Sequence, residues 1–281
     1  MIYIDVDPIA FSIGPVDVSW YGIMVALAIL TLVLWALLAV KRGANVTYET
    51  VINAALVGIP SGVIFSRFLH IIDHWDYFYH NPGEIIGGMG LTIYGAVLGA
   101  ALGIWIFSRF SKISFGYLSD MLAPGIILAQ AIGRVGCTVN GCCYGLETDI
   151  FCAIVYEHPE SLGPLGIPVH PTQIYEIIYN LIVFGVLLTL RGRLRPPGSL
   201  FIVYLTFYAI WRLGIDFIRD GTNFLFGLHE AQIISIVVLI ITITLMALRT
   251  RWQKKGEDEI PVEPPSVGPD EPESTGSDET P

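Results

Sequence analysis

Long apolar stretches separated by short polar segments dominate the chain. A helix needs about 20 mostly apolar residues to cross roughly 30 Å of hydrocarbon. Seven stretches reach this length, at residues 20–40, 50–72, 91–110, 117–135, 173–190, 199–217 and 229–249. Backbone polar groups in lipid have to be satisfied within the segment, so each stretch predicts a helix. The pattern therefore predicts an all-α membrane protein with seven transmembrane helices.

The segments outside these stretches predict the remaining organisation. Residues 1–19 form an extracytoplasmic arm, and residues 136–172 form a small head within a membrane domain of residues 20–250. Residues 251–281 follow the last span, and from Gly256 onward they contain nine Asp or Glu, six Pro and no Lys or Arg. A segment so poor in apolar residues cannot bury a core, so we expect a disordered tail.

Charge changes this picture once the tail is set aside. The chain of 281 residues has a net charge of −10, and it is 53% hydrophobic and 14% charged. Without the nine acids of the tail, 15 basic residues stand against 16 acidic ones, so the membrane domain is almost neutral. An acidic chain gives no reason to expect nucleic acid as a partner, because phosphate backbones attract Lys and Arg.

The distribution of basic residues predicts the orientation in the membrane. Eleven of the 15 Lys and Arg lie at residues 41–42, 109–112, 191–195 and 249–255, which are alternate ends of the seven spans. Loops rich in Lys and Arg stay in the cytoplasm. We therefore expect the amino terminus and the head outside, and the acidic tail in the cytoplasm.

Four arginines remain, and they lie within spans or at their outer ends: Arg67, Arg134, Arg212 and Arg219. An isolated cation in a span costs about 2.5–3.5 kcal/mol on insertion scales, so each arginine needs a partner. One interpretation pairs each with a nearby acid, as Asp216 would pair with Arg212 one helical turn away. The other gives them a shared anionic ligand at the outer face, and four arginines at similar depth favour it.

Three polar motifs accompany these arginines. Residues 133–145, Gly-Arg-Val-Gly-Cys-Thr-Val-Asn-Gly-Cys-Cys-Tyr-Gly, combine a guanidinium with glycines that let the backbone approach a phosphate. Residues 170–176, His-Pro-Thr-Gln-Ile-Tyr-Glu, place polar side chains at the start of the fifth span. In residues 208–220 a tyrosine, two arginines and an aspartate recur every three or four positions, which predicts one polar face on an apolar helix.

The outer region also contains the four cysteines of the chain, Cys137, Cys142, Cys143 and Cys152. An oxidising outer compartment favours a structural disulfide. The C-x4-C-C spacing is not a familiar zinc pattern, so no metal and no other cofactor is expected. A metal site, a redox-active thiol and free buried thiols stay open as alternatives.

In their order and spacing, these motifs resemble the prolipoprotein diacylglyceryl transferase family. So do Trp20-Tyr21-Gly22 at the first span, Arg67 in the second, and Gly87-Gly88-Met89 ahead of Tyr94-Gly95. The resemblance covers residues 14 to about 250. It implies a bacterial plasma-membrane enzyme that moves the diacylglyceryl group of phosphatidylglycerol onto the lipobox cysteine of a prolipoprotein, and glycerol phosphate leaves.

The resemblance also implies the residues of the site, with Arg134 as the first choice for holding the phosphate and Arg212 as the second. The implied catalytic residues are Tyr94, His170, Tyr208 and Arg212. The implied substrate-binding residues are Arg134, Tyr21, Asn140, Gly145, Arg67, Asp216, Arg219, Gln173 and Glu176.

The chain departs from the family pattern at Tyr94, Cys137 and Cys142. Tyr94 stands where the family usually has the His assigned as base, and the cysteines stand where Asn and Glu are common. A phenol with a pKa of about 10 is a poor base at neutral pH, so His170 becomes an alternative for thiol deprotonation. Two other functions stay open: a related lipid-headgroup transferase with a different acceptor, and a polytopic anion or lipid transporter without catalysis.

Overall fold

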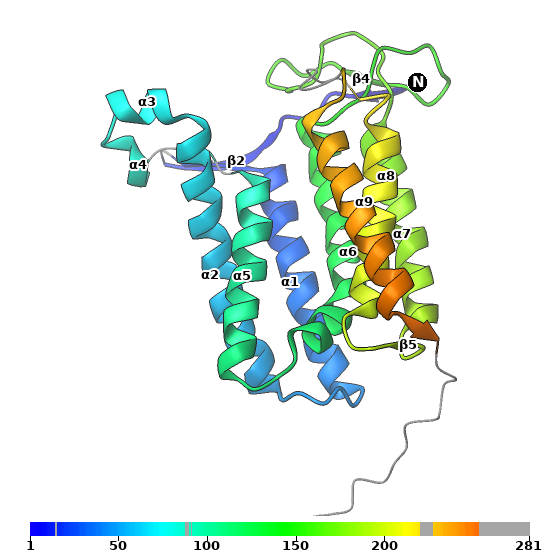
Figure 1. The fold of residues 1–281 in the computed structure, drawn as a ribbon. Helices are drawn as coiled ribbons and strands as arrows, with labels where there is room; N and C mark the ends of the chain where they lie inside the picture. Colours follow the sequence, from blue (N-terminus) through cyan, green and yellow to red (C-terminus); the bar gives the residue numbers. More distant parts are fainter. Residues whose placement is uncertain (15, 88–89, 91, 220–226, 253–281) are drawn as a thin grey trace, which may run out of the picture.

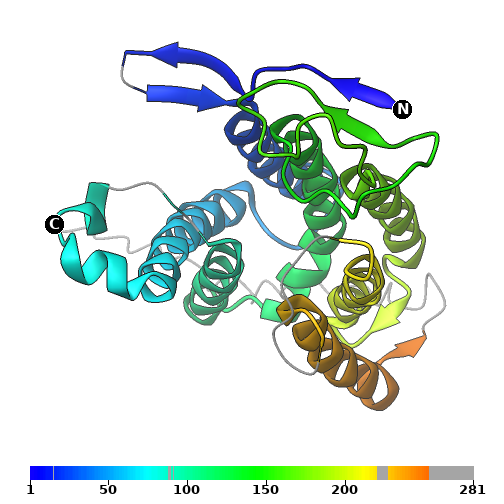
Figure 2. The same ribbon diagram turned by 90° about the horizontal axis from the view of Figure 1, so that it is seen from above.

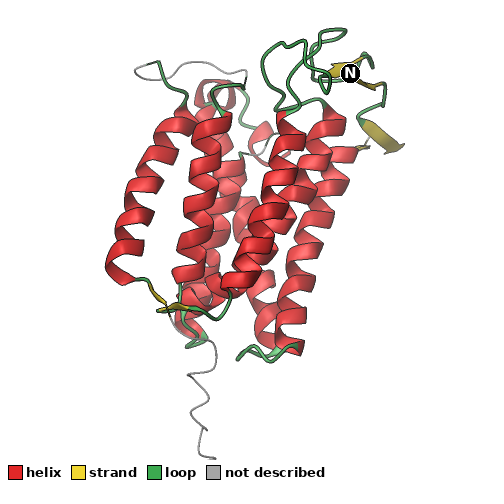
Figure 3. Ribbon diagram, turned by 90° about the vertical axis from the view of Figure 1, so that its right-hand side faces the viewer, coloured by secondary structure: helices red, strands yellow, loops and turns green. Residues whose placement is uncertain are grey.

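The computed structural model describes residues 1–252 except residues 15, 88–89, 91 and 220–226. Most of this described chain is helical, and the long helices run side by side (Figures 1 and 3). They are α1 (Trp20–Lys41), α2 (Tyr48–Asp73), α5 (Ile93–Phe110), α6 (Phe115–Asn140), α7 (Thr172–Leu190), α8 (Ser199–Ile215) and α9 (Glu230–Arg249).

The predicted membrane class is confirmed by these helices. Among the described residues, six helices are long and apolar enough to cross a membrane: α1, α2, α5, α6, α7 and α9. α8 is an apolar helix of 17 residues, shorter than the others. Large apolar side chains face outward from the helices; Leu56, Ile64 and Val97 are 66%, 65% and 62% exposed. A surface so apolar is suited to lipid contact.

The ends of several helices follow from local sequence. The hydroxyl of Ser19 accepts a hydrogen bond from the amide of Gly22 and caps α1, and Thr47 caps α2 in the same way. Such caps satisfy amides that have no partner within the helix. α6 runs to Asn140, five residues beyond the predicted end at 135, and stops at Gly141 in the left-handed conformation.

Two groups of helices are visible in Figures 1 and 2: α2 pairs with α5, while α6, α7, α8 and α9 form a larger bundle against which α1 packs. Glycines allow the α2–α5 contact. A Cβ at Gly95 would lie 2.5 Å from the carbonyl oxygen of Phe65, and a Cβ at Gly99 would lie 2.5 Å from that of Ser61. No side chain tolerates these distances, so α2 and α5 touch through their backbones.

A small head lies at one end of the bundle, where the chain also begins (Figure 1). There β1 (Ile2–Ile4) pairs in parallel with β4 (Ile154–Tyr156), and β2 (Ile9–Ile13) forms a hairpin with β3 (Val16–Ser19). Ile154, Tyr156 and Val169 form the buried core of the head. Two short helices, α3 (Trp75–His80) and α4 (Glu84–Gly87), follow α2.

At the opposite end, β5 (Leu194–Arg195) pairs with β6 (Arg251–Trp252). The predicted tail therefore begins with two strand residues, and the rest of it, residues 253–281, lies outside the described residues. Gly88 and Met89 of the motif ahead of Tyr94 lie outside them as well.

Candidate active site

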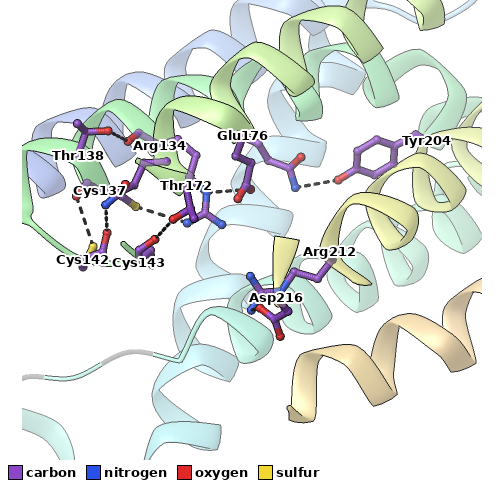
Figure 4. A network of polar contacts seen from close by, with 12 residues as sticks. Arg134, Cys137, Thr138, Cys142, Cys143, Thr172, Glu176, Tyr204, Arg212 and Asp216 are labelled. Carbon is purple, nitrogen blue, oxygen red and sulfur yellow. Dashed lines mark hydrogen bonds and ion pairs between the residues drawn. The ribbon is translucent and has the colours of Figure 1, made fainter. Parts of the chain in front are cut away.

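A sharp turn after α6 forms the first part of the site. Gly141 ends the helix with φ 74°, and two residues later Cys143 has φ 65°. A positive φ is uncommon for a residue with a Cβ, and such residues concentrate at functional sites. The turn brings Cys142 and Cys143 back to Cys137 on the last turn of α6 (Figure 4).

The Sγ atoms of these three cysteines all lie within 4.8 Å of one another. Cys137 is buried, and Cys142 and Cys143 are partly buried. Hydrogen bonds from the Cys137 and Cys142 thiols lower the pKa of the Cys143 thiol. The positive charges of Arg134 and Arg219 act in the same direction, and burial opposes them.

The expectation of a disulfide was wrong: in the structure all four cysteines are free thiols. Cys152 does not belong to the cluster; its Sγ lies 3.9 Å from the hydroxyl of Tyr175 on α7. The cluster contains three thiols because the turn at Gly141 and Cys143 folds the chain back on itself, and linear spacing does not reveal such a turn.

Arg134 lies one turn before Cys137 on α6 and links α6 to α7. Its Nε is 2.8 Å from Oε1 of Glu176, and its Nη1 is 3.8 Å from Sγ of Cys137 (Figure 4). The Arg134 and Glu176 side chains are only 18% and 6% exposed, so water screens the ion pair weakly. Tyr21 on α1 lies beside this group, where Arg134 and the three cysteines act electrostatically on its hydroxyl.

The start of α7 holds the cysteine turn in place. Oγ1 of Thr172 donates to the carbonyl oxygen of Cys143 at 2.6 Å, and Nε2 of Gln173 donates to that of Cys142 at 2.7 Å. Nε2 of Gln173 is also 3.2 Å from the hydroxyl of Tyr156. Burial raises the pKa of Tyr156 above that of an ordinary tyrosine. The positions of Cys142 and Cys143 are therefore fixed through their carbonyl groups.

A second group of site residues lies at the end of α8. Nη2 of Arg212 is 3.3 Å from Oδ1 of Asp216, the pair that the less favoured interpretation of these arginines expected (Figure 4). Oδ2 of Asp216 is 3.5 Å from Nδ1 of His229, the residue that caps α9. Arg212 and Asp216 also act electrostatically on the hydroxyl of Tyr94 at the start of α5. Asp216 thus orients Arg212 and joins α8 to α9.

Arg219 connects the end of α8 with the head. Its backbone forms a bridge with Gly145, and the amide of Leu146 donates to the carbonyl oxygen of Ile218 at 2.8 Å. A Cβ at Gly145 would lie 2.6 Å from the carbonyl oxygen of Ile218, so this close approach requires glycine. The charge of Arg219 consequently acts on Cys143.

Arg67 binds both α4 and the segment that follows it. Its Nε donates to the carbonyl oxygen of Ile85 at 3.0 Å, and its Nη1 donates to that of Gly90 at 3.0 Å. The guanidinium also lies over the ring of Phe78, 5.1 Å from its centre. With these partners Arg67 fastens α2 to α4 and to Gly90.

The other expected residues lie near the two groups. Asn140 ends α6, and its side chain hydrogen-bonds to Cys142. Nδ1 of His170, in the head, is 3.4 Å from the hydroxyl of Tyr175. Tyr208 packs beside Tyr204 on α8, with 6.4 Å between ring centres.

Sequence reasoning missed several polar residues of this region. Nε2 of Gln130 donates to the hydroxyl of Tyr204 at 3.0 Å and links α6 to α8. A glutamine inside an apolar span was a visible signal, because such a residue needs a partner in the membrane. His229 and Tyr156 carried no comparable signal, since their partners come from distant parts of the chain.

The fold and the site together define an integral membrane protein with a shielded arginine–carboxylate pair beside its head. Residues 8–248 match the family model described as prolipoprotein diacylglyceryl transferase. The chain belongs to the prolipoprotein diacylglyceryl transferase family, and this confirms the resemblance seen in the sequence.

Individual relatives agree with the family model. A protein of Dehalococcoides mccartyi named phosphatidylglycerol–prolipoprotein diacylglyceryl transferase is 48% identical over 257 residues, covering 92% of this chain and 99% of the relative. Proteins of the same name from Listeria innocua and Clostridioides difficile are 34% and 33% identical, and they cover 86% and 83% of this chain. The matches cover 90% and 92% of those two relatives.

Proposed function

We propose that this protein transfers the diacylglyceryl group of phosphatidylglycerol to the thiol of a lipobox cysteine in a prolipoprotein, and that it releases glycerol phosphate. Two findings support the proposal. The chain belongs to a family of transferases along nearly all of its membrane domain. The observation that carries the chemistry is the shielded pair of Arg134 and Glu176 beside the head.

The protein lies in the bacterial inner membrane with α8 as a seventh span. The basic segments at residues 41–42, 109–112, 191–195 and 249–251 lie at the end of the bundle opposite the head (Figure 1). Because positively charged loops stay inside, this end faces the cytoplasm, and residues 1–19 and the head face outward. Residues 20–250 form the membrane domain, and residues 251–281 form a disordered cytoplasmic tail.

Arg134 holds the phosphate of phosphatidylglycerol, and Glu176 orients it. A carboxylate that holds Nε directs the terminal nitrogens of a guanidinium, and these form paired hydrogen bonds with phosphate oxygens. Departure of glycerol phosphate develops negative charge, and a preorganised cation in a weakly screened site stabilises that charge. Arg212, held by Asp216, and Arg219 add positive charge, while Arg67 shapes the outer loop that borders the site.

The hydroxyls around these arginines orient the two substrates. Tyr21 lies with Arg134, and Tyr94 lies within the field of Arg212. We assign Tyr94 and Tyr208 as hydrogen-bond donors to the lipid headgroup, because a phenol donates well and is a poor base at neutral pH. His170 accepts the thiol proton and passes it to water at the outer face.

The remaining expected residues lie beside the turn that follows α6 and form part of the substrate-binding site. Asn140 and Gln173 contact Cys142 through its side chain and its carbonyl group. Gly145 allows the head to approach the end of α8. Together they place the lipobox peptide across the turn that follows α6.

Reconstitution of the purified protein tests the proposal. Vesicles containing phosphatidylglycerol are incubated with a lipobox peptide, and mass spectrometry detects a diacylglyceryl thioether on its cysteine. Vesicles of phosphatidylethanolamine and a peptide with serine in place of the cysteine are the matched controls, and neither should yield product. Consumption of phosphatidylglycerol without a modified peptide would indicate another acceptor, and movement of lipid without consumption would indicate a transporter.

A further inference from the structure

The thiols of Cys137, Cys142 and Cys143 form an unusual group at the outer end of α6. Their Sγ atoms lie within 4.8 Å of one another. Three thiolates around a zinc ion, with Zn–S bonds of about 2.3 Å at tetrahedral angles, would lie roughly 3.8 Å apart. The upper limit of 4.8 Å exceeds this spacing by about 1 Å.

The backbone conformation and its hydrogen bonds hold Cys142 and Cys143 in position. Cys143 has the left-handed conformation, with φ 65°, and such strained residues persist where the surroundings hold them. Hydrogen bonds from Thr172 and Gln173 to the carbonyl oxygens of Cys143 and Cys142 supply that support. These hydrogen bonds hold the backbone of two of the three cysteines and so limit the positions that their Sγ atoms can take.

The charges around the cluster suit a bound divalent cation. Three thiolates and one zinc ion carry a net charge of −1. Arg134 lies 3.8 Å from Sγ of Cys137, and the charge of Arg219 acts on Cys143. Glu176 balances one of these arginines, so the occupied site and its neighbours are electrically neutral.

We propose that the three cysteines bind a thiophilic divalent cation of the zinc class, whose fourth position takes the thiol of the acceptor cysteine. Three protein ligands with one open position are characteristic of catalytic zinc sites. A thiol that coordinates such an ion is deprotonated outright. This role rests on the proposed transferase function, and it supplies the activated sulfur that Tyr94, a poor base, cannot supply.

Transfer begins with coordination of the acceptor thiol. The acceptor thiol binds the cation as a thiolate, and its proton passes through His170 to water. The sulfur attacks the carbon of the diacylglyceryl group that is bonded to a phosphate oxygen, so a C–S bond forms while that C–O bond breaks. The electron pair of that bond leaves with glycerol phosphate beside Arg134. The neutral thioether binds the cation more weakly than a thiolate, and water displaces it.

Metal binding tests the site independently of activity. The full-length protein is purified in detergent under reducing conditions, its zinc content is measured, and the metal-free form is titrated with Cd²⁺. We expect one equivalent of metal and a thiolate-to-cadmium absorption band. The band should disappear in Cys142→Ser and Cys137→Ser and persist in Cys152→Ser, whose thiol lies outside the cluster. A stoichiometry near zero with four titratable thiols, or a Cys137–Cys142 disulfide in the intact protein, would overturn the site.

Activity separates the site from the proposed function. Removal of the metal, or Cys142→Ser, should lower kcat/KM by about 10²–10⁴-fold, which is the usual contribution of deprotonation by the enzyme. Zinc should restore the metal-free wild type but not the variant. Thermal unfolding of the variants checks that they are folded. Full activity without metal would overturn this catalytic role and leave the transferase function intact, whereas bound metal without thioether product in any preparation would refute the transferase function.

Discussion

The ion pair between Arg134 and Glu176 stabilises the fold and also positions Arg134 for catalysis. A double-mutant cycle separates these two roles. The two side chains are 18% and 6% exposed, and their atoms are 2.8 Å apart. Removing one partner of a buried pair leaves an uncompensated charge and costs about 3–5 kcal/mol. Replacing both by neutral groups is far less damaging. Arg134→Gln and Glu176→Gln should therefore each lower the unfolding temperature in detergent, and the double variant should recover most of the loss.

Activity should not recover with stability if Arg134 holds the phosphate. Removing one preorganised donor from a transition state costs about 10²–10³-fold in rate. Arg134→Gln and the double variant should both lose about this factor in kcat/KM, while Glu176→Gln should lose less because Arg134 keeps its charge. Arg109→Gln, which removes an exposed arginine at the opposite end of the bundle, is the matched control. A double variant that regained activity together with stability would show that the pair only fastens α6 to α7.

Three further predictions concern other parts of the structure. Gly99→Leu should separate α2 from α5 and lower stability by about 1–3 kcal/mol in thermal unfolding, whereas Gly185→Leu, with no atom within 4 Å of the added Cβ, should not. Equal effects of the two substitutions would contradict the close contact. Asp216→Asn should lower kcat/KM by about tenfold or more, because a hydrogen bond to a charged group contributes about 1.5–3 kcal/mol; an unchanged value would remove its orienting role. Tyr94→Phe should lower kcat by less than tenfold, well short of a general base's contribution, and keep the pH profile; loss of the rise in rate with increasing pH would identify Tyr94 as the base.

The spans were predictable because a helix that crosses the lipid needs a long run of apolar residues. Each long helix lies over one predicted apolar stretch, and the pairing of Arg212 with Asp216 followed from their spacing on one helix. The short strands β1 and β4 were not predicted. Their pairing joins residues about 150 positions apart, and three-residue strands carry too little pattern to be recognised.

The candidate site was predictable in its residue types and less so in its geometry. The motif around Arg134 identified the end of α6, but Glu176 as its partner follows from the packing of α6 against α7. The oxidising outer compartment favoured a disulfide, and the linear spacing of the cysteines argued against a zinc site. Their actual grouping depends on the left-handed backbone of Gly141 and Cys143, and no periodic pattern encodes that turn.

The position of the lipid phosphate is the central claim, and a structure of the protein in nanodiscs of phosphatidylglycerol measures it directly. We expect a headgroup phosphate within hydrogen-bond distance, about 3 Å, of the terminal nitrogens of Arg134, with Glu176 still bound to its Nε. A headgroup bound elsewhere, with Arg134 contacting Glu176 and no lipid, would contradict the account.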